Sequence, residues 1–272
     1  MNLLSITWDV EPEIFRIGPI HPQWYGLLWA CGIALAWWIT RKIFKHEGHP
    51  DDWVDKFGVY MIIGVIVGAR LGHCFFYDGA YFLANPLEII LPFHDGKFLG
   101  YAGLASHGGA IGILIAAWLY NKRVSKKGFL WLMDRLVIGA AVCGACIRFG
   151  NLINSEIYGS VTSLPWGFIF VRAGETEPMH PTQIYEMIYC LVTFAIIWWM
   201  YWKKDAAKKQ GLIFGVFLIG IFVTRFLLEF IKLNQETFEE GMLLNMGQIL
   251  SIPFIIWGIW LIFRKHKAVR KK

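Results

Sequence analysis

The sequence predicts an all-α integral membrane protein with seven transmembrane helices in a single membrane domain, residues 1–272. Hydrophobic residues make up 56% of the chain and 14 residues are tryptophan, so the polar residues are too few to cover the apolar ones in water. The chain also contains several apolar runs that are each long enough to cross about 30 Å of hydrocarbon. It shows no internal repeat and no linker rich in Gly, Ser or Pro that would mark a second domain.

The apolar runs are separated by shorter polar segments, and each run has roughly 17 to 25 residues. They lie near residues 24–44, 57–76, 102–120, 129–149, 182–202, 211–231 and 246–263. The polar segment between the fourth and fifth runs, of about 31 residues, is too long for a simple connection. We therefore expect it to form a small outward-facing head region at about residues 150–181.

The distribution of basic residues predicts which side of the membrane each end faces. Most of the 26 lysines and arginines follow the first, third, fifth and seventh runs, and such residues accumulate on the cytoplasmic side. This set comprises Arg41, Lys42, Lys45, Lys56, Lys122, Arg123, Lys126, Lys127, Arg135, Lys203, Lys204, Lys208, Lys209, Arg264, Lys265, Lys267, Arg270, Lys271 and Lys272. The opposite side holds Arg16, Lys97, Arg172 and Lys232. We expect the N-terminus outside and the C-terminus in the cytoplasm. The +6 net charge is then a signal of topology, and we expect the basic C-terminal tail to contact anionic lipid and not nucleic acid.

Three arginines remain inside the runs or at their outer ends: Arg70, Arg148 and Arg225. An arginine in lipid costs a few kcal/mol or more, so each is expected to face the interior of the bundle at a functional site. Structural alternatives stay open for two of them. Arg70 can form an ion pair or extend to the head groups, and Arg225 precedes Glu229 by one helical turn, the spacing of an intrahelical pair.

Arg148 opens the most polar stretch of the apolar regions, which ends at Gly159. If the fourth helix continues past it, Asn151 and Ser155 share its face, and Asn154 and Glu156 lie beside that face. A purely structural polar cluster is the alternative. So many costly side chains in one segment favour a functional site.

Further polar groups fall on the same side of the membrane. His107 lies in ASHGGAIG, where glycines allow a backbone or a ligand to approach closely, although a hydrogen-bonded structural histidine is the alternative. HPTQIYE, His180 to Glu186, opens the fifth run, and a capped helix start is its structural explanation. Tyr25 lies at the same level in PQWYGLLW. Paired arginines in a dry cavity suit a phosphate and a histidine suits proton transfer, so the substrate is expected to be amphiphilic and anionic.

Four motifs, in order along nearly the whole chain, resemble the bacterial phosphatidylglycerol:prolipoprotein diacylglyceryl transferase family. The run R-x-G-N-x-x-N-x-E-x-x-G is similar to the signature of that family and is specific, whereas HGG alone is weak. The motifs are HGG at His107 to Gly109, the signature at Arg148 to Gly159, HPTQIYE at His180 to Glu186, and MGQILSIP at Met246 to Pro253.

The resemblance implies an enzyme of lipoprotein biosynthesis in the bacterial cytoplasmic (inner) membrane. Its partners would be phosphatidylglycerol, the lipobox peptides of preprolipoproteins and membrane lipids, and it would need neither a cofactor nor a metal. The diacylglyceryl group would pass to the lipobox cysteine thiol, with formation of a thioether and release of glycerol phosphate. Buried arginines would stabilise the charge that the leaving glycerol phosphate gains.

The resemblance also implies roles for individual residues. Arg148 and Arg225 would bind the lipid phosphate and stabilise the departing one, and His107 would be the candidate base for the thiol. The residues that would line or hold the cavity are Tyr25, Arg70, Asn151, Asn154, Glu156, Gly159 and Glu229. The chain departs from the family pattern at Ile221, where some members carry an aromatic hydroxyl, and in IKLNQE after Phe230, where an arginine with Pro-Asp is usual.

Other function classes fit the sequence less well. A retinal photoreceptor needs a lysine in the last run, and Met246 to Phe263 has none. The five cysteines lie in apolar runs, and no zinc, serine-hydrolase or nucleotide motif is present. A transporter or flippase for an anionic lipid remains the alternative, although such a protein would be expected to show paired halves or charges placed at the midplane.

Overall fold

The computed structural model describes residues 5–18, 21–76, 79–90, 93–94, 97–98, 105–233 and 242–265. Within these residues the chain is mostly helical, and six helices are long and apolar enough to cross a membrane. They are α1 (Trp24–His46), α2 (Asp51–Phe76), α5 (Phe129–Ile153), α6 (Thr182–Lys203), α7 (Leu212–Leu228) with its continuation η5 (Glu229–Ile231), and α8 (Met246–Phe263). The predicted helical membrane class is confirmed at this level, and the six helices match six of the predicted runs.

The predicted run at 102–120 corresponds to a shorter helix. α4 (Ser106–Tyr120) has 15 residues and continues into a π-helical turn, η2 (Asn121–Ser125). Residues 102–104 lie outside the described part of the chain. The count of seven spans therefore stays a prediction.

The chain divides into two compact units, each described here by itself. Unit 1 comprises residues 1–40 and 133–272, and unit 2 comprises residues 41–132. Unit 2 contains α2, α4 and η2 together with α3 (Gly79–Ala84), η1 (Pro86–Ile89) and an antiparallel pair of short strands, β2 (Phe93–His94) and β3 (Lys97–Phe98). Unit 1 contains most of α1 and α5 and all of α6, α7 and α8.

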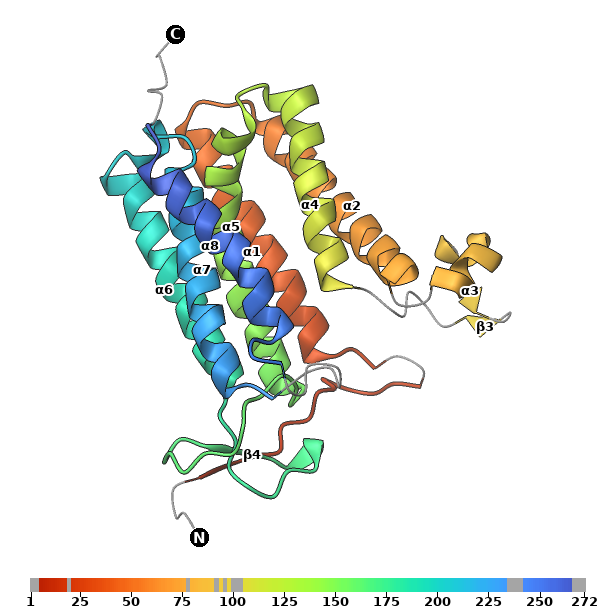
Figure 1. Ribbon diagram of the computed structural model, residues 1–272. Helices are drawn as coiled ribbons and strands as arrows, with labels where there is room; N and C mark the ends of the chain where they lie inside the picture. Colours follow the sequence, from red (N-terminus) through yellow and green to blue (C-terminus); the bar gives the residue numbers. More distant parts are fainter. Residues whose placement is uncertain are drawn as a thin grey trace. The chain divides into compact units, whose positions relative to one another are not determined.

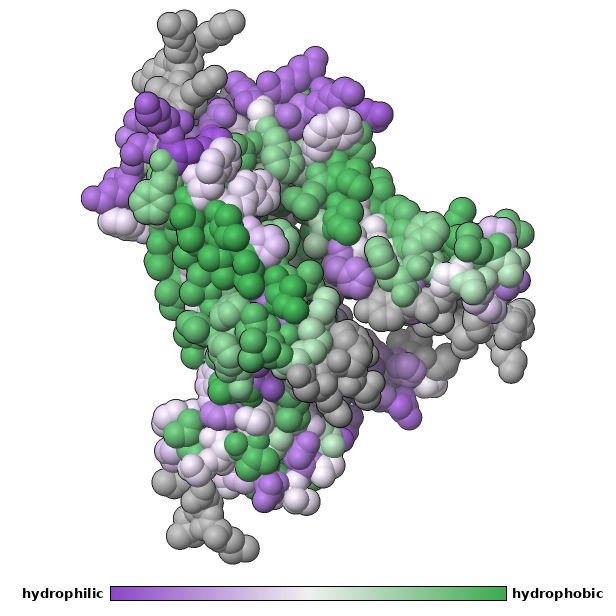
Figure 2. Space-filling view, viewed as in Figure 1, coloured by the Kyte–Doolittle hydropathy of each residue, from purple (hydrophilic) through white to green (hydrophobic). Residues whose placement is uncertain are grey.

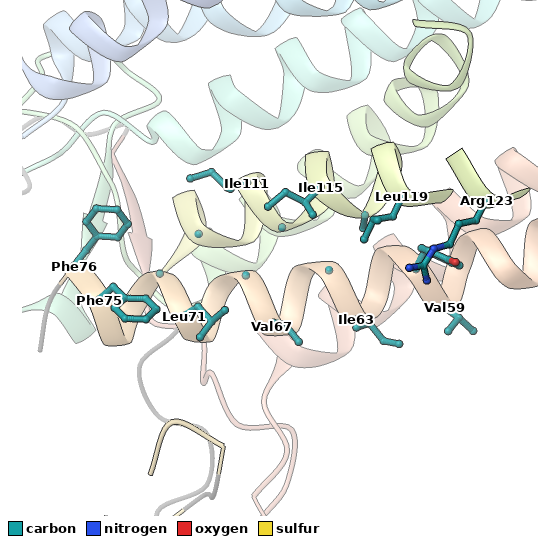
Figure 3. Close-up of a pocket in the computed structure, with 17 residues that line it drawn as sticks. Val59, Ile63, Val67, Leu71, Phe75, Phe76, Ile111, Ile115, Leu119 and Arg123 are labelled. Carbon is teal, nitrogen blue, oxygen red and sulfur yellow. The ribbon is translucent and has the colours of Figure 1, made fainter. Parts of the chain in front are cut away.

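In unit 2, α2 and α4 pack through facing glycines. A Cβ atom added to Gly72 would lie 2.7 Å from the Cα of Gly108, and one added to Gly64 would lie 2.6 Å from the Cβ of Ala116. Glycine lets helix backbones approach this closely, which is how helices commonly associate in membranes. Along this contact runs an apolar groove of about 610 Å³, with Ile63 and Ile115 in its wall and Arg123 at one end (Figure 3).

Unit 1 is a bundle of long helices (Figure 1) whose contacts also use small residues. Gly139 of α5 lies against Ala36 of α1, and Gly215 of α7 faces Gly258 of α8. Hydrophobic side chains cover the outward faces of α6 to α8, and hydrophilic ones gather where α6 and α8 end (Figure 2). This banding is the pattern that a bilayer selects, because lipid contacts the middle of each helix and water contacts its ends.

The residues before α1 and after α5 fold together at the other end of these helices. β1 (Ile6–Trp8) pairs in parallel with β4 (Phe168–Phe170), and the indole of Trp8 donates a 2.9 Å hydrogen bond to the carbonyl of Leu152. Tyr158 stacks on Phe170 at 4.8 Å. Burial and the hydrogen bond that it donates to Glu175 raise the pKa of Tyr158 to about 12. The strand pair is therefore tied to the end of α5, where Arg148 lies.

The start of α7 is capped from α5 by Asp134, which is fully buried. Its carboxylate accepts hydrogen bonds from the backbone N–H groups of Gly211 (2.6 Å) and Phe214 (2.9 Å). Asp134→Ala leaves two buried donors without an acceptor, so we expect unfolding to become easier by about 2–3 kcal/mol. Denaturation in detergent micelles measures this change. Asp134→Asn, which retains one acceptor oxygen, is the control, and a wild-type unfolding curve for the alanine variant would contradict the capping role.

Candidate active site

Arg148 lies in the last two turns of α5, and its guanidinium begins a series of polar contacts. Its Nη1 donates to Oδ1 of Asn151 at 3.3 Å, and Nδ2 of Asn151 donates to Oε1 of Glu156 at 2.7 Å. Nδ2 of Asn154 reaches the same carboxylate oxygen at 3.4 Å. The structure thus brings together four of the predicted site residues, and the i, i+3 spacing of Arg148 and Asn151 places both on one face as expected.

The helical pattern stops before Ser155, because α5 ends at Ile153. Ser155 and Ile157 both have positive φ angles, 54° and 61°. This conformation is strained for a β-branched residue such as Ile157 and is maintained only where the surroundings hold it. The first turn of α6 does so: Thr182 donates to the carbonyl of Ile157 and Gln183 to that of Glu156, at 2.8 and 2.7 Å.

Gly159 lies where three segments meet. Its N–H donates to the carbonyl of His180 at 2.9 Å, and the next residue, Ser160, donates from its N–H to the carbonyl of Ile231 at 2.8 Å. A Cβ atom at Gly159 would lie 2.5 Å from that Ile231 oxygen and 2.8 Å from the Cβ of His180. A glycine is therefore required here because the neighbouring backbone and side-chain atoms leave no room for a Cβ atom. Its φ angle does not require glycine.

Gly159→Ala is expected to push the segment after α5 away from η5 and to lower turnover at this site by about a hundredfold or more, because a shift of about 1 Å at a catalytic site is costly. Gly26→Ala is the matched control, since a Cβ atom at Gly26 meets nothing within 4 Å. Turnover by purified protein of the lipobox peptide that the sequence motifs predict as substrate measures both variants. Equal activity of the two variants would show that the junction tolerates a side chain.

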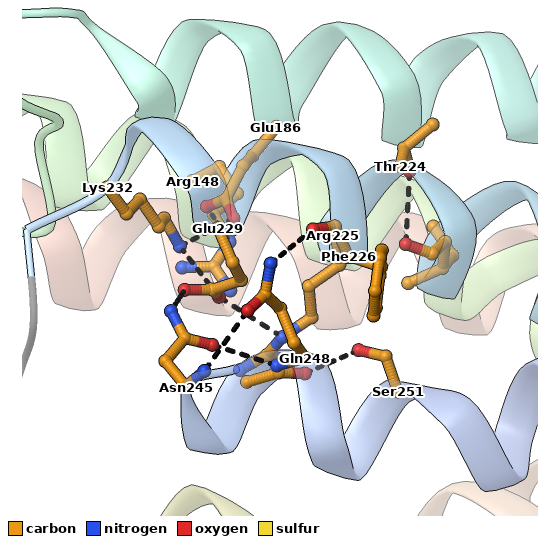
Figure 4. Close-up of polar contacts among 12 residues, drawn as sticks. Arg148, Glu186, Thr224, Arg225, Phe226, Glu229, Lys232, Asn245, Gln248 and Ser251 are labelled. Carbon is orange, nitrogen blue, oxygen red and sulfur yellow. Dashed lines mark hydrogen bonds and ion pairs between the residues drawn. The ribbon is translucent and has the colours of Figure 1, made fainter. Parts of the chain in front are cut away.

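An alternating chain of charges connects three helices in the interior of unit 1 (Figure 4). Arg148 Nε lies 2.9 Å from Oε2 of Glu186 on α6, and Oε1 of the same carboxylate lies 2.8 Å from Nζ of Lys232. Lys232 Nζ also lies 3.6 Å from Oε1 of Glu229, which is 3.6 Å from Nε of Arg225. The two predicted phosphate-binding arginines are thus joined through two carboxylates and a lysine.

The start of α8 completes this region. Asn245 caps the helix by accepting from the N–H of Gln248, and its own amide donates to Oε2 of Glu229 at 3.1 Å. A Cβ atom at Gly247 would lie 2.6 Å from the Glu229 carboxylate. Gly247 of the motif MGQ therefore allows the backbone to approach Glu229 closely, and Asn245, directly before the motif, supplies the amide that positions this carboxylate.

Tyr25, at the start of α1, is half-buried and lies over Gly150. A Cβ atom at Gly150 would be 2.7 Å from Cδ2 of the Tyr25 ring. The Tyr25 ring therefore packs against Gly150, a residue two positions after Arg148 in the chain, and lies near the end of α5 as the sequence predicts. His180, outside the spans, has its pKa lowered by burial, and its Nδ1 lies 3.3 Å from the hydroxyl of Tyr185.

Two predicted site residues belong to unit 2. Arg70 donates from Nε to the carbonyl of Ile89 at 3.1 Å and from Nη2 to that of Glu88 at 2.7 Å, so it holds η1 against α2. His107 is exposed in the first turn of α4, with its ring 5.5 Å from that of Phe76 in an edge-on arrangement. Their proposed roles as head-group ligand and base stay predictions.

Sequence reasoning left three site residues out: Glu186, Lys232 and Asn245. Glu186 was visible in HPTQIYE, three residues after Gln183, and the structure buries both side chains completely. Lys232 was counted among the outer cations, yet its side chain is only 3% exposed. Lys232 lies in IKLNQE, where the chain departs from the family pattern, but nothing in these residues predicts its burial.

Comparison with known proteins agrees with the motifs. The family model described as prolipoprotein diacylglyceryl transferase matches residues 12–264. Proteins named phosphatidylglycerol--prolipoprotein diacylglyceryl transferase are similar over nearly their full lengths. One from Porphyromonas gingivalis is 50% identical, covering 96% of this chain and 95% of its own. One from Chloroherpeton thalassium is 42% identical (97% and 96%), and one from Bacteroides fragilis is 41% identical (98% and 99%). The chain belongs to the prolipoprotein diacylglyceryl transferase family.

Proposed function

We propose that the protein transfers the diacylglyceryl group of phosphatidylglycerol to the lipobox cysteine thiol of a preprolipoprotein, the first step of lipoprotein maturation. The observation that carries this proposal is the joining of Arg148 and Arg225 in one chain of charges whose middle members, Glu186, Lys232 and Glu229, are buried. Family membership supports it independently. Two guanidiniums held at one site suit a phosphate group, which they bind through charge-assisted hydrogen bonds.

In the reaction, the cysteine sulfur forms a bond to the glyceryl carbon that carries the phosphate, and the bond from that carbon to the phosphate oxygen breaks. The phosphodiester, with one negative charge, leaves as a glycerol phosphate monoester that carries a second. Arg148 and Arg225 are positioned by their carboxylates to stabilise that added charge. The thiol proton passes to a base, and His107 is our candidate because an imidazole accepts protons near neutral pH.

Tyr25, Asn151, Asn154, Glu156, Gly159 and Glu229 are proposed to line or hold the lipid-binding site, and Arg70 to contact a head group. For most of them, contact with the region of Arg148 or Arg225 supports this role. Arg70 is supported only by its predicted place near the outer end of α2.

We also propose seven membrane crossings, with α4 and η2 as the third and with the N-terminus outside. The residues between α5 and α6 then form the outer head region, and the protein lies in the bacterial cytoplasmic membrane. The asymmetry of basic residues supports this orientation. Labelling of single cysteines introduced at Gly174 and Lys208 with an impermeant reagent tests it, and reaction of the second in intact cells would refute it.

The reaction is tested by mass spectrometry of a lipobox peptide after incubation with purified protein and phosphatidylglycerol. We expect a diacylglyceryl mass gain on the cysteine with wild-type protein and its loss with His107→Ala. Full activity of His107→Ala would refute the role of that histidine. Lipid movement across vesicles without any covalent product would instead favour an anionic-lipid transporter or flippase.

A further inference from the structure

Lys232 is a buried cation in a membrane protein. It follows η5, and its side chain is only 3% exposed, less than that of either arginine in the charge chain (22% for Arg148 and 38% for Arg225). An isolated buried ammonium is very costly, so its place requires anionic partners. It has two, the carboxylates of Glu186 and Glu229.

Lys232 shares each carboxylate with one arginine (Figure 4). Glu186 gives Oε1 to Lys232 and Oε2 to Arg148, through the Nε of that guanidinium. Glu229 places Oε1 at 3.6 Å from both Lys232 and Arg225, while its Oε2 accepts from Asn245. Every carboxylate oxygen of the pair therefore has a cation or an amide beside it.

This sharing limits how many donors each arginine spends on the protein. A carboxylate with both oxygens available binds a guanidinium through two parallel hydrogen bonds. Because Lys232 occupies Oε1 of Glu186, the carboxylate is shared, and Arg148 approaches the other oxygen, Oε2, through its Nε. Among the described residues, Nε of Arg225 is buried without a hydrogen-bond partner, so the protein does not use all the donors of this guanidinium either.

The balance of charge points the same way. The chain of ion pairs contains three cations and two carboxylates, a formal sum of +1. Without Lys232 the two arginines and two carboxylates would neutralise one another. Within this chain of ion pairs Lys232 therefore leaves one excess positive charge, which a phosphate would offset; a further carboxylate, Glu156, is joined to Arg148 through Asn151 and lies outside the chain.

We infer that Lys232 is a positioning residue: it holds Glu186 and Glu229 away from full pairing with Arg148 and Arg225, and so keeps guanidinium donors available for the lipid phosphate. The inference rests on the proposed function for its ligand, a phosphodiester lipid. It assigns a role to the residue in the segment where this chain departs from the family pattern.

The test compares Lys232→Met, Lys232→Arg and Lys208→Met in the full-length protein. Lys208 is the control, because it too forms an ion pair, with Asp205 at 2.6 Å, but its side chain is 66% exposed. Two quantities are measured: retention of phosphatidylglycerol by native mass spectrometry, and the KM for this lipid in turnover of a lipobox peptide. We expect Lys232→Met to weaken lipid binding and to raise the KM for the lipid, each by about tenfold or more. Lys232→Arg is expected to retain most of the wild-type lipid affinity and KM. Lys208→Met is expected to behave as wild type.

A merely structural lysine would behave differently. Its loss would reduce the folded fraction and lower kcat while the remaining protein kept its KM and its lipid affinity, and that result would overturn the inference. If Lys232→Met does not fold, Glu186→Gln/Lys232→Met carries the test, because it loses one charge of each sign. We expect its lipid affinity within about threefold of wild type, and a tenfold loss would overturn the inference.

The measurement of lipid retention tests this inference separately from the proposed reaction. Wild-type protein that retains phosphatidylglycerol but leaves the peptide unmodified would refute the transfer and leave the comparison of Lys232 variants valid, because binding needs no turnover.

Discussion

Arg148→Ala is expected to lower kcat/KM for diacylglyceryl transfer by about a thousandfold, the scale seen when a preorganised donor to a developing anion is removed. The guanidinium is held by Glu186 at 2.9 Å and by Asn151 at 3.3 Å, so it is fixed before the lipid arrives. The mass gain of a lipobox peptide, followed over time, measures the loss. Arg148→Lys keeps the charge but not the planar fork of donors, and an intermediate loss is expected.

Arg172→Ala is the control for Arg148→Ala. This guanidinium also pairs with carboxylates, those of Asp9 at 2.8 Å and Glu11 at 2.7 Å, but it lies between β4 and α6 and is 37% exposed. Its removal is expected to leave kcat/KM within about twofold, as exposed pairs contribute little. Equal losses for both variants would mean that Arg148 acts through folding, and wild-type activity of Arg148→Ala would remove it from the site.

Glu186→Ala is expected to have the largest effect on stability, about 3–5 kcal/mol in the free energy of unfolding. The side chain is 1% exposed and joins two cations, Arg148 and Lys232. Without the carboxylate both cations lose their nearest counter-charge in a region that water does not reach freely. Chemical denaturation in detergent micelles, with and without phosphatidylglycerol, measures the change.

Asp52→Ala is the matched control for Glu186→Ala. Asp52 also pairs with a lysine, Lys56 at 2.6 Å, but its side chain is 57% exposed. Its removal is expected to cost less than about 1 kcal/mol. Glu186→Gln separates charge from shape, since the amide fills the same space. If Glu186→Gln is as stable as wild type, the charge of Glu186 contributes nothing to the fold.

The helices and part of the site were predictable because their causes are local. A run of about 20 apolar residues is a membrane helix whatever surrounds it, and six predicted runs match observed helices. The i, i+3 spacing likewise placed Arg148 and Asn151 on one face. The prediction that Ser155 shares this helical face was wrong, because α5 ends at Ile153. Ser155 and Ile157 have positive φ angles, and hydrogen bonds from Thr182 and Gln183 of α6 hold this segment.

The sequence by itself determined the membrane class, the positions of six helices, the family and the polar stretches that carry Arg148 and Arg225. These depend on composition, periodicity and motifs read along the chain. Only the tertiary structure decided which charges pair: Glu186 lies 38 residues after Arg148 and 46 before Lys232 in the sequence. An ion pair between helices depends on how the backbones pack. Small residues such as Gly139 and Gly159 set that packing through contacts with partners distant in the sequence.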